Sequence, residues 1–160
     1  MRYAGIIYDD TAAAPGLSLS LYTQGCPFHC KGCHNPETWD FEGGYEYTAE
    51  TQEKIIKSLN ANGVLRNLCI LGGEPLLKEN VLTLSILCGL AKTLYPDIKI
   101  YIWTGYTMDE IQDRVNSELS LYSLVFELTD TLVTGRYEED KRDITLPLRG
   151  SWNQEAWRLG

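Results

Sequence analysis

Hydrophobic residues along this chain fall into short runs and helical repeats that alternate with one another. Leucine alternates with polar residues over 17–21, which predicts a β-strand that leads toward Cys26. Apolar residues at helical spacing among Glu and Lys over 48–62 predict a surface helix. The apolar run 67–71 predicts a second strand, and the leucine-rich stretch from about 80 to 94 predicts a second helix.

The same alternation continues in the second half of the chain. The β-branched and aromatic run 98–103 predicts a strand, and 107–110 has the form of a capping box, which opens a helix. The apolar runs 124–128 and 131–133 each predict a strand. The tail 143–160 shows no clear periodicity, so we assign no element to it.

This order of elements predicts an α/β fold with a mostly parallel sheet, because strands that alternate with helices form βαβ units. A complete barrel of eight such units takes ~250 residues, so 160 residues can form only part of one. We therefore expect a single domain over 1–160, built as an open, incomplete TIM-like βα barrel. Its site should lie at the carboxyl ends of the strands.

Composition and charge exclude several classes of function. The hydrophobic fraction of 44%, with 22% charged residues, is ordinary for a soluble globular protein. A net charge of -8 and the absence of a dense basic run argue against a nucleic-acid partner. The first residues form too short an apolar run for a signal peptide, and no segment has membrane-spanning length. We expect a cytoplasmic protein that does not enter a membrane.

Three of the five cysteines are clustered, which indicates a metal site. Thiols in the cytoplasm stay reduced, so a cluster of them points to metal or catalysis before disulfides. Cys26, Cys30 and Cys33 fall within one short loop and could hold three irons of an iron-sulfur cluster, with the last iron open. The alternative is zinc, completed by His29, His34 or a distant cysteine. The spacing favours the cluster, because zinc sites more often use paired ligand motifs.

The remaining candidate residues are less specific on their own. Cys69 lies in an apolar strand and Cys88 in a leucine-rich helix, so we expect both to fill the core. The turn 72–75 (Gly-Gly-Glu-Pro) ends a strand and would let the backbone approach a ligand, or it is a plain turn with an exposed carboxylate. Thr104 and Gly105, at the next strand end, form either another wall of the same pocket or an ordinary turn.

The cysteine loop and the Gly-Gly-Glu-Pro turn together resemble the radical S-adenosylmethionine superfamily. Within it, the chain is most similar to the activating proteins of anaerobic ribonucleoside-triphosphate reductase. The likeness extends over nearly the whole chain, in the segments 25–39, 71–76, 103–106, 132–137 and 149–154.

The resemblance implies a 4Fe-4S cluster held by Cys26, Cys30 and Cys33, with S-adenosylmethionine chelated to the open iron. Its reductive cleavage gives a 5'-deoxyadenosyl radical that takes hydrogen from a glycine of the reductase. No residue is expected to act as a general acid or base, because the cofactor does the chemistry. The residues implied in cofactor binding are Gly32, Cys33, His34, Gly72, Gly73, Glu74, Thr104 and Gly105.

The implied partners are the glycyl radical subunit of the reductase and an electron donor such as reduced flavodoxin. Two alternatives remain: an activase of another glycyl radical enzyme such as pyruvate formate-lyase, or a non-enzymatic zinc or iron-sulfur scaffold. The chain departs from the family pattern at 14–18, where the family usually has Gly-Pro-Gly followed by arginine, and at Thr134, where aspartate is common.

Overall fold

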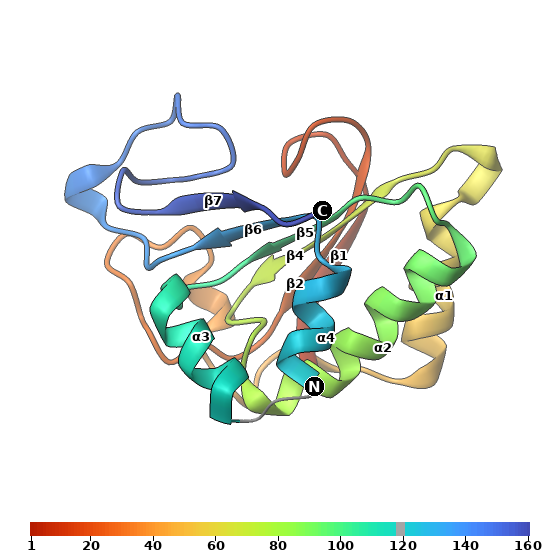
Figure 1. The fold of residues 1–160 in the computed structure, drawn as a ribbon, viewed down its shortest axis with the longest axis horizontal. Coiled ribbons are helices and arrows are strands. Elements are labelled where there is room, and N and C mark those ends of the chain that lie inside the picture. Colours follow the sequence, from red (N-terminus) through yellow and green to blue (C-terminus); the bar gives the residue numbers. More distant parts are fainter. Residues whose placement is uncertain (118–120) are drawn as a thin grey trace.

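The computed structural model describes residues 1–117 and 121–160, and within them the strands form one mixed sheet (Figure 1). Its seven strands follow the order β3-β1-β2-β4-β5-β6-β7. In chain order the strands are β1 (Arg2–Asp10), β2 (Ser18–Thr23), β3 (Tyr45–Glu46), β4 (Asn67–Gly72), β5 (Ile100–Trp103), β6 (Thr131–Thr134) and β7 (Glu155–Arg158).

The parallel part of the sheet is its centre. Strands β2, β4, β5 and β6 run parallel, whereas β1, β3 and β7 pair antiparallel at the two sides. The sheet stays open, because β3 and β7 stand at opposite ends of the strand order. The predicted α/β fold with a mostly parallel, unclosed sheet is therefore confirmed, and its shape is consistent with part of a βα barrel.

The helices pack mainly on one side of this sheet. Figure 1 shows α1, α2 and α4 beneath the strands, with α3 near the carboxyl ends of β4 and β5. Among the described residues no helix is long and apolar enough to cross a membrane. The helices are α1 (Ala49–Leu59), α2 (Lys78–Leu94), α3 (Met108–Ser117) and α4 (Leu121–Leu128), with 3-10 turns at Pro36–Thr38, Ala61–Gly63 and Glu139–Lys141.

Side-chain caps fix where two of these helices begin. The Thr48 hydroxyl accepts a hydrogen bond from the Thr51 amide at 3.2 Å, which caps α1. At α3, the Thr107 amide donates to the Glu110 carboxylate at 2.8 Å, and the Glu110 amide donates to the Thr107 hydroxyl at 3.3 Å. This reciprocal pair is the predicted capping box.

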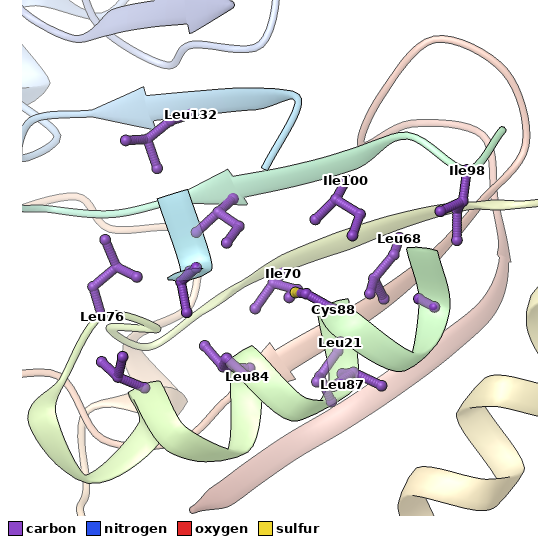
Figure 2. Packing of buried hydrophobic residues seen from close by; sticks show 14 of the residues in the cluster. Leu21, Leu68, Ile70, Leu76, Leu84, Leu87, Cys88, Ile98, Ile100 and Leu132 are labelled. Atoms are coloured by element: carbon purple, nitrogen blue, oxygen red, sulfur yellow. The ribbon is translucent and has the colours of Figure 1, made fainter. Parts of the chain in front are cut away.

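The core lies between the central strands and α2. In Figure 2 Leu84, Leu87 and Cys88 of α2 point toward Ile70 and other strand residues, and all of these side chains are fully buried. Cys69 is also fully buried. Both cysteines therefore fill the core, as predicted, and neither can serve the site without unpacking it.

The prediction of a strand over 124–128 is wrong, because these residues belong to the helix α4. Tyr122 and Val125 are buried, three residues apart on one side of the helix, while Leu121 and Leu124 are exposed. A short apolar run cannot distinguish a strand from a helix by its periodicity alone, and here the helical spacing decides.

The sequence analysis also missed strands at the two ends of the chain. Strand β1 is antiparallel to β2, with a bulge between Tyr3 and Gly5, and most of its residues are only half-buried. Strand β7 is exposed along its whole length and pairs with β6. Neither the half-buried β1 nor the exposed edge strand β7 carries a clear hydrophobic alternation, so pattern analysis could not find them.

A buried carboxylate connects α2 to the start of β6. The Asp130 side chain accepts hydrogen bonds from Lys92 at 2.6 Å, from Lys99 at 3.0 Å and from the Ile100 amide at 2.8 Å. Burial alone would raise the pKa of Asp130, but these three donors outweigh it and lower the pKa below its ordinary value of 3.8. The ionised carboxylate is thus part of the folded state.

We expect Asp130→Asn to lower the free energy of unfolding by about 2 kcal/mol at pH 7, because the amide can keep only part of the three hydrogen bonds. Urea unfolding measures this loss. Asp97→Asn, at an exposed carboxylate, is the matched control and should change stability by less than about 0.5 kcal/mol.

The difference in free energy of unfolding between wild type and Asp130→Asn should depend on pH. A folded-state pKa below 3.8 means that Asp130 stabilises the fold above that pH and loses this contribution as the pH falls through the lowered value. The gap between wild type and Asp130→Asn should therefore narrow in acid. A gap that stays constant down to pH 3 would contradict this assignment.

Candidate functional site

The carboxyl ends of the parallel strands surround a cavity of about 670 Å³. The strand register places Thr23 beside Gly72 and Trp103 beside Val133 at this edge of the sheet. A cavity of this size is typical for a cofactor or a small substrate. The structure brings nearly all of the predicted site residues into its wall, namely Cys26, Cys30, Cys33, His34, Gly72, Gly73, Glu74, Thr104 and Gly105.

Gly32 is the predicted site residue that does not line the cavity. It has a φ of +74°, a backbone conformation that favours glycine, whereas the exposed Glu139 carboxylate 2.8 Å from a Cβ built there could move aside. The neighbouring Lys31 pairs with Glu139 at 3.1 Å. His29 is also outside the lining and stacks on Trp39 with ring centroids 4.7 Å apart.

The cysteine loop is closed by backbone hydrogen bonds at its base. The Gly25 amide donates to the Thr38 carbonyl at 2.7 Å, and the Cys26 amide donates to the Trp39 carbonyl at 3.2 Å. The loop therefore leaves β2, passes along the cavity and returns to the same edge of the sheet. The three thiols are half-buried and unpaired, so they are available as ligands.

The three thiols suit an iron-sulfur cluster by their chemistry. Burial raises the pKa of Cys26 and of Cys30, so both need a metal to hold them as thiolates at neutral pH. Among the described residues no three His, Cys, Asp or Glu side chains lie close enough together to bind a single metal ion. In an iron-sulfur cluster each thiolate binds a different iron, so the ligands stand farther apart. Three thiols of one loop that form no disulfide are the kind of donor set that an iron-sulfur cluster requires.

The two glycines of the turn after β4 are required by the backbone of β2. A Cβ on Gly72, which has a φ of +100°, would lie 2.9 Å from the Thr23 backbone, and one on Gly73 would lie 2.5 Å from the Gly25 carbonyl oxygen. The Gly73 amide donates to the Thr23 carbonyl at 2.8 Å, and the Glu74 amide donates to the Gly25 carbonyl at 2.8 Å. The close approach binds this turn to the start of the cysteine loop.

Glu74 connects the turn to the next strand end. Its side chain is fully buried, and the carboxylate accepts hydrogen bonds from the Thr104 hydroxyl at 2.6 Å, the Gly105 amide at 2.7 Å and the Leu76 amide at 2.8 Å. Burial raises its pKa to about 7, and the three donors oppose that rise. Glu74 is therefore not an exposed carboxylate in a plain turn, and Thr104 and Gly105 belong to the same wall.

An aromatic ring and an ion pair form the next part of the wall. A Cβ on Gly105 would lie 2.4 Å from the Phe28 ring. The same ring packs edge to face against Tyr106, with the ring centroids 4.9 Å apart. The Arg136 guanidinium lies 4.3 Å from the centroid of the same ring and forms a two-pronged pair with Glu110 at 2.8 and 3.0 Å. Phe28 thus joins the cysteine loop to the ends of β5 and β6.

Two segments far apart in the sequence complete the wall of the cavity. The first is 12–15, which Asp10 holds by accepting hydrogen bonds from the Ala12 amide at 2.8 Å and the Ala13 amide at 3.3 Å. This segment includes part of the stretch 14–18, which departs from the family pattern. The second is 146–150, which follows the 3-10 turn at Glu139–Lys141 (Figure 1).

Comparison with known proteins shows the family. A family model described as a 4Fe-4S single cluster domain matches residues 12–157. The anaerobic ribonucleoside-triphosphate reductase-activating protein of Vibrio cholerae serotype O1 is 36% identical over 160 residues, which covers 99% of each chain. Proteins of the same name from Escherichia coli K12 and from Enterobacteria phage T4 are 32% and 31% identical, over 99% and 98% of this chain and 99% and 94% of theirs.

The chain belongs to the family of anaerobic ribonucleoside-triphosphate reductase-activating proteins. The family model describes a domain with a single 4Fe-4S cluster, and its match includes the cysteine loop. Sequence reasoning missed several lining residues of this family member, among them Phe28, Arg136 and Arg149. Arg136 and Arg149 lie in the segments 132–137 and 149–154, where the sequence resembles the family. That resemblance could have identified them as candidate site residues.

We expect Glu74→Gln to lower the free energy of unfolding by about 2 kcal/mol. The Leu76 and Gly105 amides each donate a hydrogen bond to a different oxygen of the Glu74 carboxylate. Whichever way the glutamine amide is oriented, its NH2 group therefore faces one of these N–H groups, and that hydrogen bond is lost. Urea unfolding at neutral pH measures the effect.

The matched control is Glu79→Gln, at an exposed carboxylate in the first turn of α2, which should stay within about 0.5 kcal/mol of wild type. Equal stability of the two variants would show that the buried hydrogen bonds of Glu74 do not hold the two loops together.

Proposed function

We propose that the chain activates an anaerobic ribonucleoside-triphosphate reductase by forming a glycyl radical on it, through reductive cleavage of S-adenosylmethionine at a 4Fe-4S cluster. One observation carries the proposal: three thiols of one loop face the same cavity as the turn that contains Gly72 and Gly73. The remaining cysteines, Cys69 and Cys88, are buried in the core, so neither can serve as a fourth ligand of the cluster. One iron would remain open to the cavity.

The residues of the chain would hold and orient the reactants. Cys26, Cys30 and Cys33 would each hold one iron as thiolates. The backbone of the turn at Gly72 and Gly73 would receive the amino group of S-adenosylmethionine, and Glu74 would keep that turn fixed against Thr104. When bound, the cluster supplies one electron that splits the cofactor into methionine and a 5'-deoxyadenosyl radical, which takes one hydrogen atom from glycine to give 5'-deoxyadenosine.

The substrate glycine lies in another polypeptide, so the site must admit an extended chain. The open sheet and the cavity, whose wall includes 12–15 and 146–150, provide that room. The electron must come from an external donor of low potential, and we propose reduced flavodoxin or a protein of similar chemistry. Both partners and the reduced thiols fit a cytoplasmic location.

The family relatives favour the reductase as partner over pyruvate formate-lyase, because the relatives that match over nearly their whole length carry the name of the reductase activator. Purified reductase and purified pyruvate formate-lyase, offered separately, decide between them. A non-enzymatic zinc or iron-sulfur scaffold would bind its metal and cleave no S-adenosylmethionine.

We expect the protein, reconstituted anaerobically with iron and sulfide and reduced with dithionite, to release 5'-deoxyadenosine from S-adenosylmethionine. Replacing Cys26, Cys30 or Cys33 with alanine should abolish both cluster absorbance and product, because each thiolate holds its own iron. Iron content and chromatography of the products measure these effects.

Cys69→Ala and Cys88→Ala are the controls, and they should keep the cluster while losing stability through a cavity in the core. Full product formation after any replacement in the loop would refute the proposal. Tightly bound zinc without cleavage in the wild type would favour the scaffold.

A further inference from the structure

Arg149 stands in the cavity wall with most of its hydrogen-bonding capacity unused. It lines the main cavity and also a smaller neighbouring one of about 330 Å³. Its Nη1 donates to the Gln154 carbonyl at 3.2 Å, whereas its Nε is buried and has no partner. A guanidinium carries five N–H donors. Partial burial of these donors with a single hydrogen bond costs free energy, which a ligand that accepts further hydrogen bonds would recover.

Arg136, the other arginine of the cavity, already pairs with a carboxylate. Glu110 accepts hydrogen bonds from both of its terminal nitrogens, and this pair also lowers the pKa of Glu110. By contrast, Arg149 forms no ion pair with any carboxylate in the described part of the chain. Arg149 is therefore the arginine of this wall whose charge is not paired with a carboxylate of the described residues.

The segment around Arg149 is built to hold it in place. The Gln154 side chain accepts hydrogen bonds from the Gly150 amide at 2.8 Å and the Ser151 amide at 3.2 Å, and donates to the Gly135 carbonyl at 3.0 Å. On the other side, the Trp103 indole donates to the Leu148 carbonyl at 2.7 Å. The position of Arg149 is thus fixed from both flanks, by the loop after β6 and by the end of β5.

We propose that Arg149 binds the carboxylate of the methionine half of S-adenosylmethionine through its guanidinium. The proposal rests on the proposed function for the identity of the ligand. An amino acid group needs acceptors for its amine and a cation for its carboxylate, and the turn at Gly72 and Gly73 offers the acceptors. A planar guanidinium matches a carboxylate with two parallel hydrogen bonds.

The test compares two ligands on the cluster-loaded protein: S-adenosylmethionine and its decarboxylated analogue, which keeps the sulfonium, the adenosine and the amine. Equilibrium binding is measured for wild type, Arg149→Gln, Arg149→Lys and Arg142→Gln. Arg142 is exposed and outside the cavity lining, so it is the matched control for loss of one charge in the same segment. The analogue also loses iron chelation, but equally in every variant.

We expect Arg149→Gln to weaken binding of S-adenosylmethionine about tenfold or more and to leave binding of the analogue unchanged, because only the former presents a carboxylate to the guanidinium. Arg149→Lys should lose less, since it keeps the charge and one hydrogen bond. Arg142→Gln should bind both ligands as wild type does.

Other outcomes overturn the proposal in distinguishable ways. Equal weakening of both ligands by Arg149→Gln would mean that Arg149 only shapes the loop, and unchanged binding of both would show that Arg149 does not contact the methionine carboxylate. Iron content and thermal unfolding identify a variant that fails to fold, in which case Arg149→Lys decides, with the same contrast between ligands. Failure of the wild type to bind S-adenosylmethionine would remove the proposed function together with this inference.

Discussion

The buried hydrogen bonds of Glu74 are the interaction on which the site depends. The carboxylate holds the end of β5 through the Thr104 hydroxyl and the Gly105 amide, and the amide of the same residue holds the start of the cysteine loop through the Gly25 carbonyl. Glu74 itself follows the turn after β4. Three strand ends are therefore fixed against one another by one residue that water does not reach. Together with the hydrogen bond from the Gly73 amide to the Thr23 carbonyl, this link holds the turn against the start of the cysteine loop.

The glycine turn shows how the sequence can indicate a site while leaving its contacts open. Gly72 and Gly73 were expected to let a ligand approach the backbone. The structure shows that the close neighbour of both glycines is the β2 backbone, at Thr23 and Gly25. The turn and the cysteine loop are consequently one structural unit, which explains why the two motifs are informative only in combination. Any cofactor that meets the thiols also meets this turn.

Local patterns predicted the parts of the fold that local interactions determine. The capping box at Thr107, the buried Cys88 and the alternation that leads into Cys26 all follow from residues close in sequence. The helix α4 was misread because its apolar run is short, and the edge strand β7 was missed because it is exposed. The walls at 12–15 and 146–150 depend on contacts between distant segments, which a single sequence does not encode in a readable form.

The most direct test of the account is the glycyl radical itself. Anaerobic reductase from the same organism is mixed with the cluster-loaded protein, S-adenosylmethionine and reduced flavodoxin, and followed by electron paramagnetic resonance. The account predicts the signal of a carbon-centred glycyl radical, formed with one 5'-deoxyadenosine per radical and absent when alanine replaces the glycine of the reductase. Steady release of 5'-deoxyadenosine with no glycyl signal on the reductase would contradict it.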